Sequence, residues 1–415
     1  MASTLNHITV DGVEIPLIHE EDTRLPMVSM QVVFKQSGSI EDKTLPGLAK
    51  ISARMMNEGT SKLGSIGFAK ALDAKAVHIS ANTGTETFVM ELSSLKESFD
   101  YGLERFNELL NDPNLKDETL KKVKSVTIGS LSRKENDYDY VAARALKAEL
   151  YKGTRLEHPS RGTIEDVKKI KIADVQEFLK DHLVLSNMVI VIGGDLTLDE
   201  AKRDAKRLLK GMNRGKVTTL PFIDVVKKSH RVVLERETEQ AYLYFGSPYD
   251  MRVGDADEYK SRVAVYILGT GGFGSRLMEE IRVKRGLAYS AYARINAARS
   301  HVYFMGYLQT KLESQQEAEE TVKEVIAKFV KEGVTQEELD QAKKFLLGSE
   351  PLRVETLSQR LSRTFQEYYK GQKLGSSLDE LKKIEALTLD DLNAYIKKHT
   401  EINDLSFAIV THSKK

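Results

Sequence analysis

The sequence predicts an α+β protein made of two homologous halves, each an antiparallel-type sheet covered by helices. Three observations support this class. The 415 residues are too many for one ordinary core, strand-like alternation precedes helix-like periodicity, and this order occurs twice along the chain. Strands that cluster before helices favour α+β, because α/β proteins alternate the two strictly.

The first half opens with strand-like segments. Apolar and polar residues alternate in ITVDGVEIPLI (8–18) and in MVSMQVVFKQSG (27–38), which is typical of strands with one covered face. GLAKISARMMNEGT (47–60) follows as a short helix that ends in a glycine. Apolar residues then recur three or four positions apart in FAKALDAKA (68–76) and SLKESFDYGLERFNELLNDP (94–113), which predicts helices.

An internal repeat indicates duplication. Residues 115–130 resemble 334–349, and residues 163–194 resemble 377–411, in the same order and at nearly constant spacing. In the second half, Thr335 precedes Glu338 as in a capping box, which marks a helix start there.

The repeat divides the chain into domains of ordinary size. We predict an N-terminal domain over 1–212, a linker over 213–230 and a C-terminal domain over 231–415. The linker assignment depends on the polar, glycine-containing stretch that leads up to His230.

Composition excludes several classes of protein. The 62 basic and 61 acidic residues nearly cancel, so no overall charge points to nucleic acid or to an anionic membrane. The absence of cysteine excludes disulfides, thiolate metal sites and cysteine nucleophiles. We expect neither a transmembrane helix nor a signal peptide in this form of the chain. The lack of cysteine favours a bacterial periplasm, with a signal already removed, over a cytoplasm.

The histidines give no local metal motif. No two of the nine lie within one helical turn, so there is no His-x-x-x-His pair. Histidines distant in sequence could still assemble a site, and ordinary surface or hydrogen-bonded histidines are the alternative. Nothing indicates a Ser/His/Asp nucleophile either.

A glycine cluster, GTGGFG (269–274), separates two helix-like segments. Glycines before a helix can offer backbone N–H groups to a phosphate, but the preceding segment is helical and no Gly-Lys-Ser/Thr follows. A flexible loop is the other interpretation.

After this loop, a cation and a phenol come close in sequence. Gly286 is expected to end the helix, and LAYSAYARI (287–295) alternates as a strand. Arg282 then lies in the last helical turn and Tyr289 on the strand that leaves it. Both could bind a peptide carbonyl or the oxyanion formed from it. A solvated arginine and a core tyrosine are the alternative.

Together these segments resemble the pitrilysin, or insulinase, family of zinc peptidases. The similarity is greatest to the half-length branch that includes mitochondrial processing peptidase and bacterial processing-protease homologues. Two stretches carry it, FKQSGSIEDKTLPGLAKISARMMNEGT (34–60) and LGTGGFGSRLMEEIRVKRGLAYSAYA (268–293). The resemblance covers nearly the whole chain and implies two peptidase-like domains.

The resemblance implies that the metal site is lost. The family carries His-x-x-Glu-His on its first-half helix, with a later glutamate as the third zinc ligand. At these positions the chain has Lys50, Ala53, Arg54 and Ser130. Two cationic groups would repel a metal ion, so we expect this chain to bind none.

The resemblance also implies that substrate-contacting residues are retained. Arg282 and Tyr289 match an arginine and tyrosine that family members place near the scissile bond. Segment 77–92 resembles the edge strand that receives substrate, and an ordinary edge strand is the alternative. The implied substrate-binding residues are Ser80, Ala81, Asn82, Gly271 and Gly272.

These features predict a non-catalytic subunit of a heterodimeric zinc peptidase. A homologue with His-x-x-Glu-His would supply the zinc and the general base, and a homodimer is expected in its absence. One alternative is a structural or interaction protein, similar to the core subunits of respiratory complexes with this fold. Another is a lone enzyme with an unconventional metal site.

Overall fold

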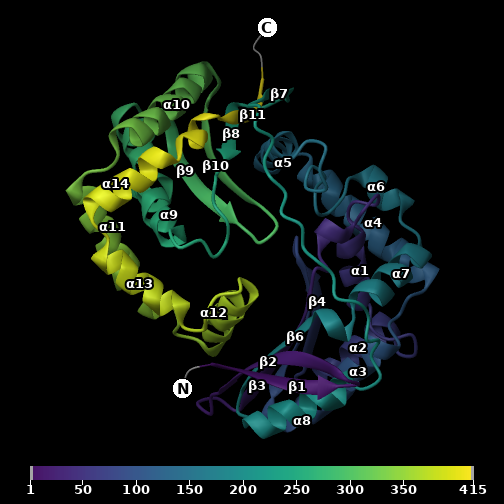
Figure 1. Ribbon diagram of the computed structural model, residues 1–415. Helices are drawn as coiled ribbons and strands as arrows, with labels where there is room; N and C mark the ends of the chain where they lie inside the picture. The colour runs from purple at the N-terminus through teal and green to yellow at the C-terminus, as the bar shows by residue number, and fades with distance from the viewer. Residues whose placement is uncertain (1–2, 413–415) are drawn as a thin grey trace. The chain divides into compact units, whose positions relative to one another are not determined.

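The computed structural model describes residues 3–412. The chain forms two compact units, each with one sheet and its own covering helices (Figure 1). Unit 1 comprises Met1–Ser132, His158–Leu220 and Arg353–Tyr369. Unit 2 comprises Arg133–Glu157, Pro221–Leu352 and Lys370–Lys415.

The sheet of unit 1 has the strand order β1-β2-β6-β3-β5-β4. Its strands are β1 (Thr4–Val10), β2 (Val13–Glu21), β3 (Met27–Lys35), β4 (His78–Thr83), β5 (Thr87–Leu95) and β6 (Met188–Gly194). β2 and β6 run parallel, and every other neighbouring pair is antiparallel. All seven residues of β6 are buried, as expected for a central strand with both faces covered.

Seven amphipathic helices of unit 1 bury their apolar faces in its core. They are α1 (Leu48–Met56), α2 (Gly64–Asp73), α3 (Lys96–Asn111), α4 (Asp117–Lys134), α6 (Ile164–Lys169), α7 (Ile172–His182) and α8 (Leu198–Leu209). In α3, Phe99, Leu103 and Phe106 are buried at the predicted three- and four-residue spacing.

Unit 2 has a five-stranded sheet of order β7-β11-β8-β10-β9. Its strands are β7 (Arg231–Glu235), β8 (Gln240–Pro248), β9 (Ala288–Ala297), β10 (Val302–Lys311) and β11 (Ser406–Thr411). Its longer helices are α9 (Glu258–Val265), α10 (Gln315–Glu332), α11 (Gln336–Gly348), α13 (Ser376–Ala386) and α14 (Leu389–Lys398). The α+β class is confirmed, and both sheets are mixed because each has one parallel pair.

The internal repeat corresponds to the same succession of elements. Residues 163–194 form α6, α7 and β6, and residues 377–411 lie in α13, α14 and β11. The capping box at Thr335 and Glu338 is present at the start of α11. Residues 213–230 contain neither helix nor strand, which agrees with their interpretation as a linker.

One helix from each half of the sequence is built into the other unit. α5 (Tyr138–Leu150) belongs to unit 2 and packs on β8 and β11, whereas α12 (Leu357–Tyr369) belongs to unit 1 and packs on β2 and β6. The halves 1–212 and 231–415 follow the duplication in the sequence, whereas the two units follow the packing of the elements. The two divisions differ because α5 and α12 each pack in the unit of the other half.

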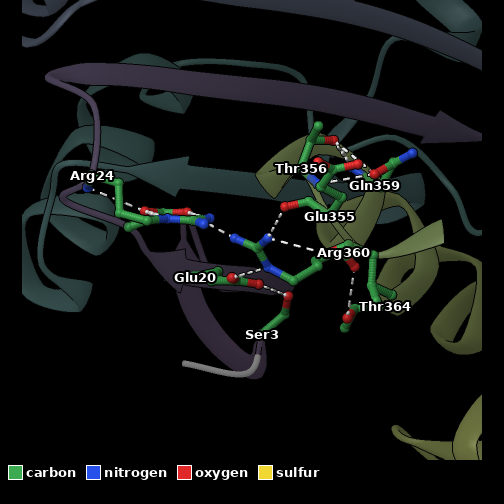
Figure 2. A network of polar contacts seen from close by, with 10 residues as sticks. Ser3, Glu20, Arg24, Glu355, Thr356, Gln359, Arg360 and Thr364 are labelled. Carbon is green, nitrogen blue, oxygen red and sulfur yellow. Dashed lines mark hydrogen bonds and ion pairs between the residues drawn. The ribbon is translucent and has the colours of Figure 1, made fainter. Parts of the chain in front are cut away.

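Ion pairs and apolar contacts hold α12 on the sheet of unit 1. Arg360 donates from Nε to Oε1 of Glu20 at 2.6 Å and from Nη2 to Oδ2 of Asp22 at 2.7 Å (Figure 2). Arg24 pairs with Asp22 from the other side, and together the two arginines hold the pKa of Asp22 well below its usual range. Leu361 packs with Ile18 in a small apolar cluster beneath the ion pairs.

Among residues 3–412, no helix is long and apolar enough to cross a membrane.

Candidate functional site

Helix α1 carries Lys50, Ala53 and Arg54, the residues that the sequence resemblance predicts at the family's metal positions. It begins after Gly47, whose φ of 92° lies in the left-handed region. The carboxylate of Asp42 accepts hydrogen bonds from the N–H groups of Gly47 at 2.8 Å and Ala49 at 2.7 Å, which satisfies two donors at the helix start. The predicted short helix is therefore confirmed, and its first turn is fixed by a buried cap.

Lys50 and Arg54 lie one turn apart on the same face of α1. The Lys50 Nζ donates to Oδ1 of Asn82 at 2.7 Å and to the carbonyl of Thr83 at 3.4 Å, both on β4. The Arg54 Nη1 donates to Oγ1 of Thr127 on α4 at 2.6 Å. The two cations therefore point toward the space between α1, β4 and α4.

The electrostatics of this face are unfavourable for a metal ion. Burial lowers the pKa of Lys50 and of Arg54, and the nearby positive charge of Arg161 lowers both further. Ala53, at the general-base position, is buried and has no polar side chain. The side chains present do not fit zinc, which requires neutral imidazole or anionic ligands.

The α4 side chain that meets Arg54 is Thr127, one turn before Ser130. Sequence alignment placed Ser130 at the third metal position, and that assignment stays a prediction. Thr127 went unnoticed because nothing in its surrounding sequence distinguishes it from other helix residues.

The predicted strand over 77–92 is a hairpin, because the chain turns at Gly84 and β5 begins at Thr87. β4 is the edge strand of the sheet, and it holds Ser80, Ala81 and Asn82.

The outward-facing peptide groups of Ala81 are already paired. The Ala81 N–H donates to Oδ1 of Asn57 at 2.8 Å, and the Asn57 Nδ2 donates to the Ala81 carbonyl at 2.8 Å. An amide side chain at the end of α1 thus makes the two bonds that an added strand would make. Sequence reasoning missed Asn57, although a polar residue at a helix C-terminus was the available signal.

In unit 2, two π-helical turns flank the glycine cluster, over Tyr266–Thr270 and Met278–Lys284. The Gly271 N–H donates to the Tyr266 carbonyl at 2.9 Å, and Gly272 has a φ of 60°. π-Helical turns are rare and often mark functional segments. The structure confirms a helix before the loop, so the context for a phosphate-binding strand–loop–helix is absent in this described segment.

Arg282 and Tyr289 lie together. The Arg282 guanidinium carbon is 4.4 Å from the Tyr289 ring centroid and 4.5 Å from that of Phe273, in the glycine loop. Gly286, with a φ of 64°, ends the helical turn as predicted and lets the chain enter β9. The side chain of Tyr289 is 81% exposed, so the alternative of a core tyrosine is wrong.

Phe273 is a partner that sequence reasoning missed. It is 67% exposed within the glycine loop, and the available signal in the sequence was a large aromatic residue among the glycines. The guanidinium therefore lies between two exposed rings, in a geometry that favours a cation–π interaction.

Within residues 3–412, no group of three or more His, Asp or Glu side chains is arranged to hold a metal ion.

Comparison with known sequences assigns both halves of the chain to one family. The profile for insulinase (peptidase family M16) matches residues 17–164, and that for the peptidase M16 inactive domain matches residues 169–346. A Helicobacter pylori protein described as the non-peptidase homolog YmxG is 43% identical over 100% of this chain and 96% of its own length. A Bacillus subtilis relative, an uncharacterized zinc protease YmxG, is 24% identical over 97% of each.

Comparison with solved structures supports the fold. A peptidase M16 inactive domain from Pseudomonas fluorescens aligns with a TM-score of 0.90 and 23% identity, over 99% of this chain and 98% of that one. A chain of complex III2 from Candida albicans aligns with a TM-score of 0.79 and 14% identity, over 98% and 96%. With profile matches over both halves and a relative that is 43% identical along its whole length, the chain belongs to peptidase family M16.

Proposed function

We propose that this chain is the non-catalytic subunit of a heterodimeric zinc peptidase. Its partner would be a homologue with His-x-x-Glu-His, which would hold the zinc and the general base. This chain would contribute Arg282, Tyr289 and the loop at Gly271 and Gly272 to a chamber that takes peptides.

The asymmetry between the two halves supports this proposal. The metal positions of the first half carry cations and an alanine, whereas Arg282 and Tyr289 of the second half remain adjacent, at 4.4 Å. Tyr289 and Phe273 expose two large rings close together, and grouped exposed apolar side chains often mark a binding surface.

The chemistry of the pair suits a reacting peptide carbonyl. A guanidinium and a phenol both donate hydrogen bonds, and such donors stabilise the negative charge that develops on the carbonyl oxygen. Arg282 lies between the rings of Phe273 and Tyr289, so the guanidinium and the phenol are held side by side. The partner's zinc would polarise the same carbonyl as a Lewis acid.

Reconstitution tests the proposal. The purified chain is mixed with a His-x-x-Glu-His homologue from the same organism, and cleavage of an unfolded peptide is followed. We expect no cleavage by this chain alone and a higher rate for the mixture than for the partner alone. Arg282→Ala and Tyr289→Phe should each lower kcat of the mixture by about 10²-fold, with little change in KM.

Arg294→Ala is the matched control, since Arg294 is an exposed cation on the same strand, β9. It should leave the rate of the mixture unchanged. If the mixture is no faster than the partner alone, or if Arg282→Ala and Tyr289→Phe leave kcat unchanged, the proposal is wrong.

A second candidate is a structural or interaction protein with no peptidase role. Two observations favour it: the peptide groups of Ala81 are bound by Asn57, and the Helicobacter pylori relative is described as a non-peptidase homolog. Affinity purification of the chain separates the candidates. A His-x-x-Glu-His partner supports the first, and subunits of a membrane complex support the second.

A further inference from the structure

Three cations gather in unit 1 with no carboxylate partner in the described chain. Lys50 and Arg54 donate only to neutral oxygens, those of Asn82, Thr83 and Thr127. Arg161 has neither an ion pair nor a side-chain hydrogen bond among residues 3–412. The cluster therefore holds positive charge that the protein itself does not balance.

Two glycines bring Arg161 to this place. A Cβ on Gly47 would lie 2.6 Å from the Arg161 carbonyl oxygen, and a Cβ on Gly162 would lie 2.3 Å from the carbonyl oxygen of Pro46. Both glycines have positive φ, of 92° and 68°. Only residues without a side chain allow the loop at 161–162 to pack this closely on the start of α1.

The cluster differs from two other half-buried arginines of the described chain, Arg360 and Arg276, which meet carboxylates. Arg360 meets Glu20 and Asp22, and Arg276 meets Glu338 at 2.6 Å. At α1 burial lowers the pKa of Lys50 most, and the positive charges of Arg161 and Arg54 lower it further. Like charges that are partly removed from water destabilise one another unless an anion joins them.

We infer that Lys50, Arg54 and Arg161 form a binding site for a phosphate-type dianion. Three cationic donors match a doubly charged oxyanion better than a carboxylate, which would offset only one of them. Arg54 uses Nη1 for Thr127, which leaves the rest of its guanidinium to donate to the ligand. This inference is independent of the proposed peptidase role, because it concerns unit 1 alone.

Calorimetric titration of the full chain with inorganic phosphate at constant ionic strength tests the inference. We expect saturable binding at one site. Lys50→Gln/Arg54→Gln should weaken binding by about 10²-fold or more, because each of the two lost charged hydrogen bonds is worth about tenfold or more. Arg161→Gln is a second variant with a replacement outside any helix, and it should also weaken binding.

Lys202→Gln/Lys206→Gln is the matched control, with the same loss of charge at the same spacing on α8 of the same unit. It should bind phosphate as the wild type does. A phosphate monoester titration distinguishes a free phosphate site from one that takes a phosphorylated small molecule. No binding by the wild type, equal weakening in the control, or acetate binding as tight as phosphate would each overturn the inference.

Discussion

The sequence resemblance predicts Arg54 at the position of the family's second histidine ligand, and its hydrogen bond shows which α4 residue faces it. Thr127 accepts that bond at 2.6 Å, one turn before Ser130. Side chains on the same helix three residues apart point in different directions by about 60°, so only one of them can be aimed well at α1.

Rebuilding the metal site would therefore depend on position 127. We expect Lys50→His/Ala53→Glu/Arg54→His combined with Thr127→Glu to bind zinc. The same triple change with Ser130→Glu should bind zinc at least about tenfold more weakly, because its third ligand would be misaimed. Even the outer-shell groups that only orient zinc ligands are worth about tenfold or more in affinity. Competition with a zinc-binding dye measures both. Equal affinities would show that Ser130 was correctly assigned.

His301 is a second residue whose surroundings set its chemistry. It is 6% exposed in unit 2, packed against the rings of Tyr151 and Tyr303. Burial and, to a smaller extent, the positive charge of Lys147 together lower its pKa to about 4.

This histidine makes the stability depend on pH. Its folded pKa is below the unfolded value of about 6.5, so the unfolded chain takes up the proton first and stability falls as pH drops from 6.5 toward 4. Between pH 7.5 and 5.0, the wild type should lose about 2 kcal/mol more unfolding free energy than His301→Gln. Urea denaturation at both pH values measures this difference. His78→Gln, at an exposed position, should match the wild type.

Among the elements, α12 depends most on a few polar residues. Glu20 is 2% exposed, and it is paired with Arg360 at 2.6 Å (Figure 2). Arg24 pairs with Asp22 too, but its side chain is 67% exposed. The two arginines therefore share a carboxylate and differ in burial.

We expect Arg360→Ala to destabilise the chain by about 3 kcal/mol or more, because it removes the cationic partner of the buried Glu20 carboxylate and leaves only the Ser3 hydroxyl as a donor to it. Arg24→Ala should cost less than about 1 kcal/mol, as is usual for exposed pairs. Urea denaturation compares them. Arg360→Met with Glu20→Gln should recover part of the loss, since no buried charge remains. Equal losses for the two single variants would contradict this account.

At this scale, periodicity alone predicted most elements. The strands from residue 8 onward, helix α3 and the helix end at Gly286 follow from local patterns of apolar residues and glycine. The hairpin over 77–92 was predicted as one strand, because that prediction came from the resemblance to the family's edge strand and not from a turn signal in the sequence. The π-helical turns beside the glycine loop were predicted only as helices, because the sequence pattern cannot separate five-residue from four-residue bonding.

At the scale of the whole molecule, the exchange of α5 and α12 could not be predicted. Both helices are amphipathic and follow ordinary helices of their own half, and the sequence does not say which sheet buries their apolar face. The candidate site was also predictable only in part. The motif residues Lys50, Arg54, Arg282 and Tyr289 are visible in the sequence, but their partners from distant segments are not.

The exchange predicts how a fragment behaves. Residues 1–220 without α12 would expose the cluster formed by Ile18, Val33, Val189 and Val191. We expect this fragment to bind a hydrophobic dye, and a peptide covering 353–369 to reduce that binding. The same peptide with Leu361→Asp is the control and should have no effect. A fragment that binds no dye would show that α12 is dispensable for covering this face.

The pairing of Asn57 with Ala81 also bears on how copies of this protein meet. An exposed edge strand is a template on which other chains can pair, and it is a common starting point for aggregation. On β4 one side-chain amide takes the place of a neighbouring strand at the middle of that edge. At this point of the edge, Asn57 takes up the two peptide groups of Ala81 that the strand of a second copy would otherwise bind.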